Sequence, residues 1–249
     1  MKNIFILITV CTVGYTQCLG DMNRDGIKDV LDILILVDDI LDGNGECDEI
    51  TEVCVDIDGN FYSTVQIGNQ LWMSENLKTT HYNNGDEIPT GLTDGEWQIA
   101  TSGALAVYDD NESNVDIYGR LYNWYAVDDS RCVCPENFHI PTDEEYILLI
   151  DYLGGNDIAG GKMKEAGLEH WDSPNTGATN ESGFSGLPGG FRNMTGGYVD
   201  MGSLGVFRSS SEYNSYQAWY HALYYSDSVA YWDFNMQKNS GNSVRCIGD

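Results

Sequence analysis

The stretch NWYAVDDSRCVCPENFHIPTDEEYILLIDYL, residues 123–153, contains the clearest helix signal of the chain. Thr142 and Glu145 have the N-cap and N3 spacing of a capping box, in which each side chain satisfies a backbone N–H left free at the helix start. Gly154 and Gly155 supply a left-handed exit. Between these ends, four apolar residues fall at i, i+3, i+4 and i+7, namely Tyr146, Leu149, Ile150 and Leu153. The pattern predicts a helix that packs one face on a core.

The first residues, 1–20, have the pattern of a secretory signal peptide. Lys2 gives a positive start, residues 4–13 are apolar, and small or polar residues follow. Three residues border acceptable cleavage points, which leaves the site open: Gly14, Gln17 and Gly20. Ten apolar residues are too few to span a bilayer, and no later apolar run is longer. We therefore expect a secreted protein, extracellular or at the cell surface, with no membrane span.

Seven cysteines are present, and cleavage after residue 14 or 17 leaves six of them. An even number in an exported chain favours disulfides, although six cysteines allow fifteen pairings. Cys47 and Cys54 are close enough in sequence to close a local loop, and we expect them to pair. The residues alone leave the other pairings open.

The formal net charge is −27, from 39 acidic and 12 basic residues. A field of this sign repels nucleic-acid phosphates and anionic lipid, so neither is expected as a partner. It is compatible with solubility in salty surroundings and with binding of divalent cations. One segment favours the second interpretation.

That segment, residues 21–43, contains a calcium-loop pattern. Hard oxygens at alternate residues surround the ion, glycine permits the sharp bend at position 6, and position 7 offers its carbonyl. The proposed ligands at positions 1, 3, 5, 7, 9 and 12 are Asp21, Asn23, Asp25, Ile27, Asp29 and Asp32. Aspartate at position 12, with a helix directly after it, resembles a dockerin repeat, of which this chain has a single copy. Calcium is thus the expected cofactor, and docking to a cohesin partner stays open.

The apolar residues of the helix expected at 30–41 cover more than one of its faces. Such a helix needs cover, either from the following domain or from another chain. Residues 44–54 are acidic, contain glycine and carry the two cysteines of the expected loop, so we interpret them as a disulfide-closed linker.

From residue 55 to residue 249 the sequence changes to short alternating runs separated by turns. Many short strands with one good helix predict an α+β domain with an antiparallel sheet. The expected strands include 61–67, 218–225 and 229–234, a weaker second helix is expected at 156–167, and an irregular loop containing Trp97 is expected at 89–102.

Several phrases resemble the Fibrobacter-type major paralogous domain (FISUMP) family. They are DIDGNFYSTVQIGNQLWMSENL at 56–77, LYNWYAV at 121–127, CPENFHIPTDEEY at 134–146, NTGATNESGFSGLPGGFR at 175–192 and SVRC at 243–246. The resemblance implies a secreted bacterial domain with a fold similar to C-type lectins and formylglycine-generating enzymes. In those folds the domain ends are brought together, which implies a disulfide between Cys134 and Cys246. Cys132 is an addition to the family pattern.

No spacing selects a catalytic constellation. Among 39 acids any carboxylate pair could be drawn, and the four histidines lie far apart without metal-ligand spacing. The alternative function is a copper-dependent oxidase of the formylglycine-generating type, in which Cys132 and Cys134 would form the redox pair. We therefore expect that this protein is not an enzyme.

Aromatic residues give the better functional prediction, because tyrosine and tryptophan stack on sugar rings and anchor protein partners. Alternation in 218–225 is expected to place Trp219, His221, Leu223 and Tyr225 on one face. The candidate ligand-binding residues are Trp219, Tyr220, Tyr224, Tyr225 and Trp232, with Asn175, Asn180 and Glu181 from a glycine-rich loop. The expected function is recognition of a glycan or an extracellular protein, and a passive structural or adhesive role is the further alternative.

Overall fold

A computed structural model describes residues 53–249, without the side chains of residues 233 and 234. Residues 53–249 belong to one compact unit. The expected signal peptide, the calcium loop and almost all of the linker lie outside the described residues. The described part mixes helices and strands, as the predicted α+β class requires. It contains no helix that is long and apolar enough to cross a membrane.

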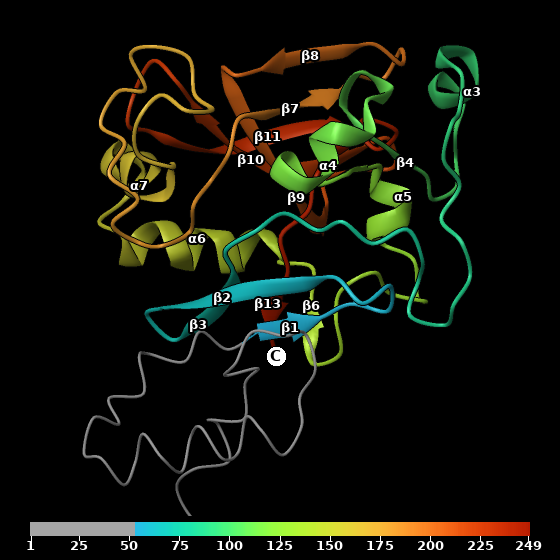
Figure 1. Cartoon of the computed structure of the whole chain (residues 1–249), viewed down its shortest axis with the longest axis horizontal. Coiled ribbons are helices and arrows are strands. Elements are labelled where there is room, and N and C mark those ends of the chain that lie inside the picture. Colours follow the sequence, from blue (N-terminus) through green and yellow to red (C-terminus); the bar gives the residue numbers. More distant parts are fainter. Residues whose placement is uncertain (1–52) are drawn as a thin grey trace, which may run out of the picture. The chain divides into compact units, whose positions relative to one another are not determined.

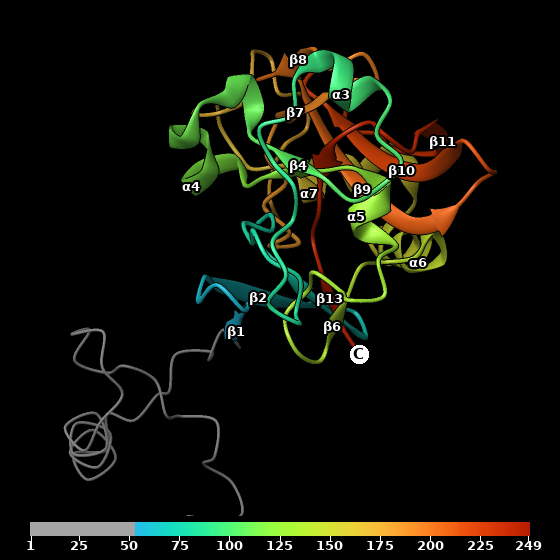
Figure 2. The same cartoon turned by 90° about the vertical axis from the view of Figure 1, so that its right-hand side faces the viewer.

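Within residues 53–249 the strands form two sheets, one below the other in Figure 1, and the helix α6 (Asp143–Tyr152) lies at a height between them in both views (Figures 1 and 2). The smaller sheet has the order β1-β2-β3-β13-β6. Its strands are β1 (Val53–Val55), β2 (Phe61–Ile67), β3 (Gln70–Met73), β13 (Ile247–Gly248) and β6 (Phe138–His139). Because β13 pairs with β3, this sheet contains both the first and the last of the described strands.

The hairpin from β1 to β2 follows from local sequence. Gly59 has a φ of 83°, and the Asp56 carboxylate accepts hydrogen bonds from the backbone N–H groups of Asp58 and Asn60, both at 3.0 Å. The prediction of a strand at 61–67 is confirmed by β2. Strand β1 begins at Val53, two residues before the expected domain boundary, because Val53 already pairs with Ser63.

The larger sheet has the order β11-β10-β9-β12-β5-β4, and β7 joins it beside β9 while β8 pairs with β7. Its bounds are β4 (Leu105–Ala106), β5 (Leu121–Tyr122), β7 (Gly189–Arg192), β8 (Tyr198–Met201), β9 (Leu204–Glu212), β10 (Gln217–Tyr224), β11 (Ala230–Gln237) and β12 (Asn242–Ser243). β10 and β11 confirm the strands expected at 218–225 and 229–234. The pairing of β10 shifts register on both sides of Tyr220, which separates Trp219 from the alternation of the residues that follow.

The central helix prediction is confirmed by α6. Thr142 is its N-cap and forms the full capping box with Glu145, and the helix ends before Gly154 with a φ of 106°. The predicted stripe is buried against the sheet. The Tyr146 ring stacks on His221 of β10 with 4.2 Å between centroids and lies 5.0 Å from Trp72 of β3. Helix α6 therefore packs on both sheets.

The second helix, α7 (Asn156–Met163), is shorter than the 156–167 expected. Two glycines lower its propensity, and the structure shows why they are present. A Cβ on Gly160 would overlap the carbonyl group of Val229, and one on Gly161 would overlap the carbonyl oxygen of Gly177. The glycine pair lets α7 lie directly against the backbone that precedes β11.

The expectation of an irregular loop throughout 89–102 is wrong. Helix α3 (Asp94–Gln98) forms there, because Thr93 and Glu96 make a capping box. It buries Trp97, over which the Arg192 guanidinium lies at 4.4 Å from the ring centroid. The remaining short elements are η1 (Tyr108–Asp110), η2 (Glu112–Asn114), α4 (Val115–Tyr118) and α5 (Trp124–Val127).

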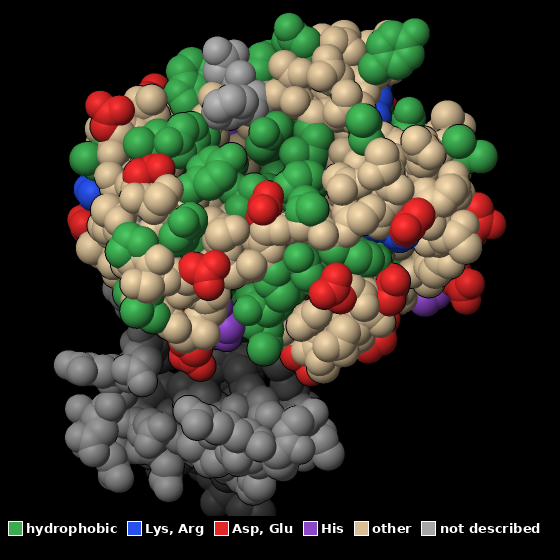
Figure 3. Space-filling view, turned by 90° about the horizontal axis from the view of Figure 1, so that it is seen from above, with side chains coloured by type: hydrophobic (Ala, Val, Ile, Leu, Met, Phe, Trp, Pro, Cys, Tyr) green, Lys and Arg blue, Asp and Glu red, His purple; other side chains and the backbone are tan. Residues whose placement is uncertain are grey.

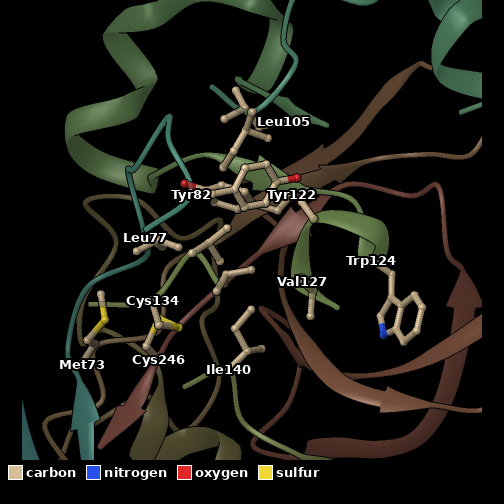
Figure 4. Close-up of a cluster of buried hydrophobic side chains, with 14 of the residues drawn as sticks. Met73, Leu77, Tyr82, Leu105, Tyr122, Trp124, Val127, Cys134, Ile140 and Cys246 are labelled. Atoms are coloured by element: carbon tan, nitrogen blue, oxygen red, sulfur yellow. A yellow bond between two sulfur atoms is a disulfide. The ribbon is translucent and has the colours of Figure 1, made fainter. Parts of the chain in front are cut away.

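A disulfide between Cys134 and Cys246 lies in the core beside Met73, Leu77 and Ile140 (Figure 4). It confirms the pairing that the family resemblance implied. The bond joins residues 112 positions apart, a loop for which chain entropy predicts about 4–5 kcal/mol of stabilisation. Cys54 is buried and forms no disulfide with a described residue, and its expected partner Cys47 lies outside residues 53–249, so that pair stays a prediction.

Candidate functional site

Tyrosine rings gather on one side of the larger sheet, in a cluster that we call the aromatic face. Its buried floor consists of Leu204 and Val206 from β9 and Ala222 from β10. Four half-buried rings pack on this floor, namely Phe191, Tyr220, Tyr224 and Tyr231. Figure 3 shows hydrophobic side chains gathered on the upper side of the molecule, where these strands lie in Figure 1. The face is thus apolar at its base and carries partly exposed rings.

The tyrosines of this face are held edge to face and lie beside carboxylates. The rings of Tyr224 and Tyr231 are 5.1 Å apart at 81°, and the Tyr231 hydroxyl donates to Asp227 Oδ2 at 3.1 Å. Burial raises the pKa of Tyr224, and the nearby charges of Asp200 and Asp227 raise it further. Both hydroxyls therefore stay protonated at neutral pH, and the two carboxylates provide hydrogen-bond acceptors at the rim.

A buried lysine fixes the end of β10. Lys164 is fully buried, and its Nζ donates to the carbonyl oxygens of Tyr224 at 2.9 Å, Asp227 at 2.7 Å and Thr176 at 3.0 Å. Burial lowers the pKa of Lys164 to about 8. The single ammonium satisfies three loop carbonyls, and it sets the backbone position of Tyr224 and of the Asp227 carboxylate that contacts Tyr231.

A buried arginine lies in the row beside Tyr220. Arg208 of β9 is the cross-strand partner of Tyr220, so the two side chains project from the same side of the sheet. Its Nη2 donates to the Ser240 carbonyl oxygen at 2.9 Å and to Asn242 Oδ1 at 2.8 Å, while Nε and Nη1 have no hydrogen-bond partner within residues 53–249. Burial lowers the pKa of Arg208. Burial raises the pKa of Tyr220, and the nearby charge of Arg208 lowers it.

The structure separates the five aromatic residues that the sequence singled out. Tyr220 and Tyr224 lie together on the aromatic face, whereas Trp219 packs edge-on against Tyr213 with 4.8 Å between centroids. Tyr225 packs on the interior cluster under α6 and α7, and Trp232 is 41% exposed outside the aromatic face. The predicted shared face is confirmed for Leu223 and Tyr225, which pack in the interior cluster, and for His221, which stacks on Tyr146 of α6. Trp219 departs from it, because the pairing of β10 with β9 shifts register between Ala218 and Tyr220.

Sequence reasoning did not select Phe191, Leu204, Val206, Ala222 or Tyr231. Strand β9 gave no clear signal, because residues 204–209 are buried on both of its faces and show no alternation of apolar and polar side chains.

The polar residues expected from the glycine-rich loop lie away from the aromatic face and stabilise turns. Asn175 Nδ2 donates to the carbonyl oxygens of Glu165 at 2.9 Å and Gly167 at 2.7 Å. The Asn180 side chain bonds Ser185 twice, at 2.8 and 2.9 Å. Both asparagines have a positive φ, which asparagine tolerates better than most residues.

Glu181 is exposed and lies 3.6 Å from Lys162 Nζ. With Tyr152 and Gln66 it lines a shallow cleft of about 340 Å³. It therefore shares no surface with Asn175 or with the aromatic rings.

Two groups of described side chains are relevant to metal binding. Glu165, Glu169 and His170 place ligand atoms within 4.8 Å of one another, and the Glu165 carboxylate pairs with His170 Nδ1 at 2.9 Å. Cys134 is bonded to Cys246, which removes one of the two thiols that a Cys132–Cys134 copper pair requires. The six expected calcium ligands lie outside the described residues.

Comparison with known proteins gives one result. The family model of the Fibrobacter succinogenes major domain matches residues 65–248. No curated protein and no solved structure matches the chain. The matched region includes β3, α6, the disulfide and the aromatic face, and most of the chain. The chain belongs to the Fibrobacter succinogenes major domain family.

Proposed function

We propose that this protein is a secreted, non-enzymatic binding module that holds a glycan on its aromatic face. The observation that carries the proposal is the set of half-buried rings of Phe191, Tyr220, Tyr224 and Tyr231 over an apolar floor. Rings of this kind offer flat apolar surface, and the tyrosine hydroxyls add polar edges. The scaffold below them is rigid, since Lys164 fixes the strand end by three hydrogen bonds.

The chemistry of the rim favours a glycan over a protein partner. The Asp227 carboxylate lies beside the rings, since it accepts the Tyr231 hydroxyl at 3.1 Å, and the charges of Asp200 and Asp227 add to burial in raising the pKa of Tyr224. Carboxylates beside stacked rings accept hydrogen bonds from sugar hydroxyls, and a sugar ring presents its C–H face to the aromatic surface.

A C-type-lectin-like fold belongs to the same proposal. Three features support it: β13 returns beside β3, the Cys134–Cys246 bond joins the end of the chain to the segment before α6, and α6 packs between the two sheets. Folds of this kind bind ligands on loops and sheet faces around a fixed core.

We also propose that the loop from Asp21 to Asp32 binds calcium and orders the N-terminal repeat. The sequence pattern alone supports this step. Terbium luminescence of the full chain tests it: bound terbium is expected to be displaced by calcium, and Asp25→Asn to weaken it. Equal binding by wild type and Asp25→Asn contradicts the assignment.

A glycan array with the full chain, followed by titration of the best ligand, tests the main proposal. Tyr224→Ala is expected to weaken binding by about tenfold, because it removes one stacking ring. Tyr216→Ala is the matched control, since Tyr216 is 78% exposed and lies outside the aromatic face. Tyr224→Phe keeps the ring and separates stacking from the hydroxyl contribution.

Three results oppose the proposal. Equal effects of the two alanine variants place the ligand elsewhere. A protein captured only by wild type, with no glycan bound, assigns the face to a protein partner. No ligand of either class favours a passive structural role.

A further inference from the structure

A buried histidine of β10 bonds the start of α6. His221 is 3% exposed, and its Nε2 donates to Asp143 Oδ1 at 3.0 Å. Asp143 is the first residue of α6, and its backbone N–H donates to Ser211 Oγ of β9 at 2.9 Å. The His221 ring also stacks on Tyr146, three residues further along the helix. One imidazole therefore holds the first turn of α6 on the larger sheet, on the side of β10 opposite the aromatic face.

The two ring nitrogens of His221 have different surroundings. The Asp143 carboxylate only accepts, so Nε2 carries the proton of the neutral ring. Nδ1 is buried and has no hydrogen-bond partner among the described residues. The cross-strand partner in β9 is Phe207, whose side chain offers no acceptor. Protonation of Nδ1 would create a second N–H without an acceptor, and burial of an unpaired donor is unfavourable. The site therefore favours the neutral ring.

The charged groups near this ring act on it in a defined direction. Burial lowers the pKa of His221, and it outweighs the hydrogen bond and the charge of Asp143, which raise it. Tyr146 stays protonated, because burial raises its pKa, while the charge of Arg245 lowers it and that of Glu145 raises it. The carboxylate of Asp143 is thus the one described charge that favours a protonated His221, and it does not prevail over burial.

We propose that His221 is an acid-sensitive switch: its neutral ring holds the first turn of α6 on β10, and its protonation in mild acid releases that turn. The reason is that a charged ring is stabilised only when water or another acceptor reaches Nδ1, which requires α6 to move away from β10. Since β10 carries Tyr220 and Tyr224 on its other side, release would also reach the glycan site, and that consequence alone rests on the proposed function.

The switch acts on the acid side of neutral pH. The unfolded imidazole binds a proton more readily than the folded one, because the folded pKa is the lower of the two. The stabilisation by the neutral ring is therefore complete above the unfolded pKa of about 6.5 and is lost as the pH falls through the folded value. His139 acts in the opposite direction, because its hydrogen bonds with Asp249 and Glu145 outweigh burial and raise its pKa.

Amide hydrogen exchange of the full chain at pH 7.5 and pH 5.0, corrected for the intrinsic effect of pH on exchange, tests the proposal without a ligand. Protection of the α6 amides in the wild type is expected to fall about threefold or more at pH 5.0. His221→Gln should keep equal protection at both values, because the glutamine amide can donate to Asp143 and does not titrate. His139→Gln is the matched control, since it removes the histidine that bonds Glu145 of the same helix, and it should retain the acid loss.

Asp143→Asn is the second variant, and it keeps the buried ring. It removes the charge that favours protonation of His221, so its loss of protection between pH 7.5 and pH 5.0 should exceed that of the wild type. The ring-proton resonances of His221, assigned by their absence in His221→Gln, should titrate below pH 6.5.

Four results would overturn the proposal. The wild type keeps its α6 protection at pH 5.0, or His221→Gln loses as much protection as the wild type. Asp143→Asn loses less protection than the wild type, or the His221 ring titrates at or above pH 6.5. Absence of glycan binding leaves all four readouts intact, so failure of the glycan proposal is distinguishable from failure of the switch.

Discussion

Lys164 Nζ donates to the carbonyl oxygen of Tyr224 at 2.9 Å, across 60 residues of chain. The lysine follows α7, and the tyrosine ends β10 and belongs to the aromatic face. A buried cation thus connects the helical layer to the strand that carries the proposed site. The same ammonium bonds Asp227, whose carboxylate accepts from Tyr231, so one residue positions two of the four rings.

Replacement of Lys164 by methionine is expected to lower the free energy of unfolding by about 2–3 kcal/mol, because three buried carbonyls lose their donor. Lys162→Met is the control. Its ammonium lies 3.6 Å from an exposed carboxylate, and loss of such a pair changes stability by about 0.5 kcal/mol. Denaturant unfolding of both variants measures the difference, and equal losses would contradict the role assigned to Lys164.

Gly160→Ala is expected to destabilise the protein by about 1–3 kcal/mol, because its Cβ would overlap the Val229 backbone and push α7 from β11. Gly95→Ala, in α3, meets no atom within 4 Å and should be neutral or stabilising by up to about 1 kcal/mol. Unfolding midpoints of the two variants decide the point. A harmless Gly160→Ala would show that α7 packs less closely than described.

Cys246→Ser is expected to cost about 4–5 kcal/mol, because it opens the bond that closes a 112-residue separation. Cys132→Ser should leave stability unchanged, since Cys132 is exposed and forms no disulfide with a described residue. Unfolding measured with and without reductant separates the two. Reductant should weaken the wild type more than the Cys246→Ser variant, which keeps only the expected Cys47–Cys54 pair.

His139 predicts a pH dependence of stability. Burial lowers its pKa, but hydrogen bonds with Asp249 Oδ1 at 2.6 Å and Glu145 Oε1 at 2.9 Å raise it above the usual value. Because the folded pKa is the higher one, the stabilisation is complete below the unfolded pKa of about 6.5 and is lost as the pH rises through the raised folded value.

His139→Gln should remove this loss, which we expect to be about 0.5–1 kcal/mol since the imidazole is 39% exposed. Urea midpoints between pH 5 and pH 9 measure it. Asp249→Asn keeps the imidazole and should remove part of the effect. An unchanged pH profile in His139→Gln would show that other groups cause the dependence.

Elements with local signals were predictable. Helix α6 combines a capping box, an apolar stripe and a glycine exit within about fifteen residues, so its sequence alone suffices. Strand β2 follows from alternation and an Asp-Gly-Asn turn. Helix α3 was missed although Thr93 and Glu96 form a capping box, because one turn with a glycine is too short to show an apolar period.

The aromatic face was only partly predictable, because its composition depends on pairings between distant strands. Alternation places Tyr220 and Tyr224 on the face opposite His221, Leu223 and Tyr225, as the structure has them. Only Trp219 departs from the expected grouping, and Phe191 joins the face from a strand distant in sequence. Side-chain direction in a bulged strand follows the partner strands, and these lie up to tens of residues away.

Local sequence was enough for the α+β class, the central helix and the family membership, because each depends on short patterns of residues close together in the chain. Long-range packing alone decided that Lys164 would bond Tyr224, that α7 needs glycine beside Val229, and which rings reach the surface together. The reason is physical: backbone propensity acts over a few residues, whereas burial, register and shared hydrogen bonds exist only once distant segments meet.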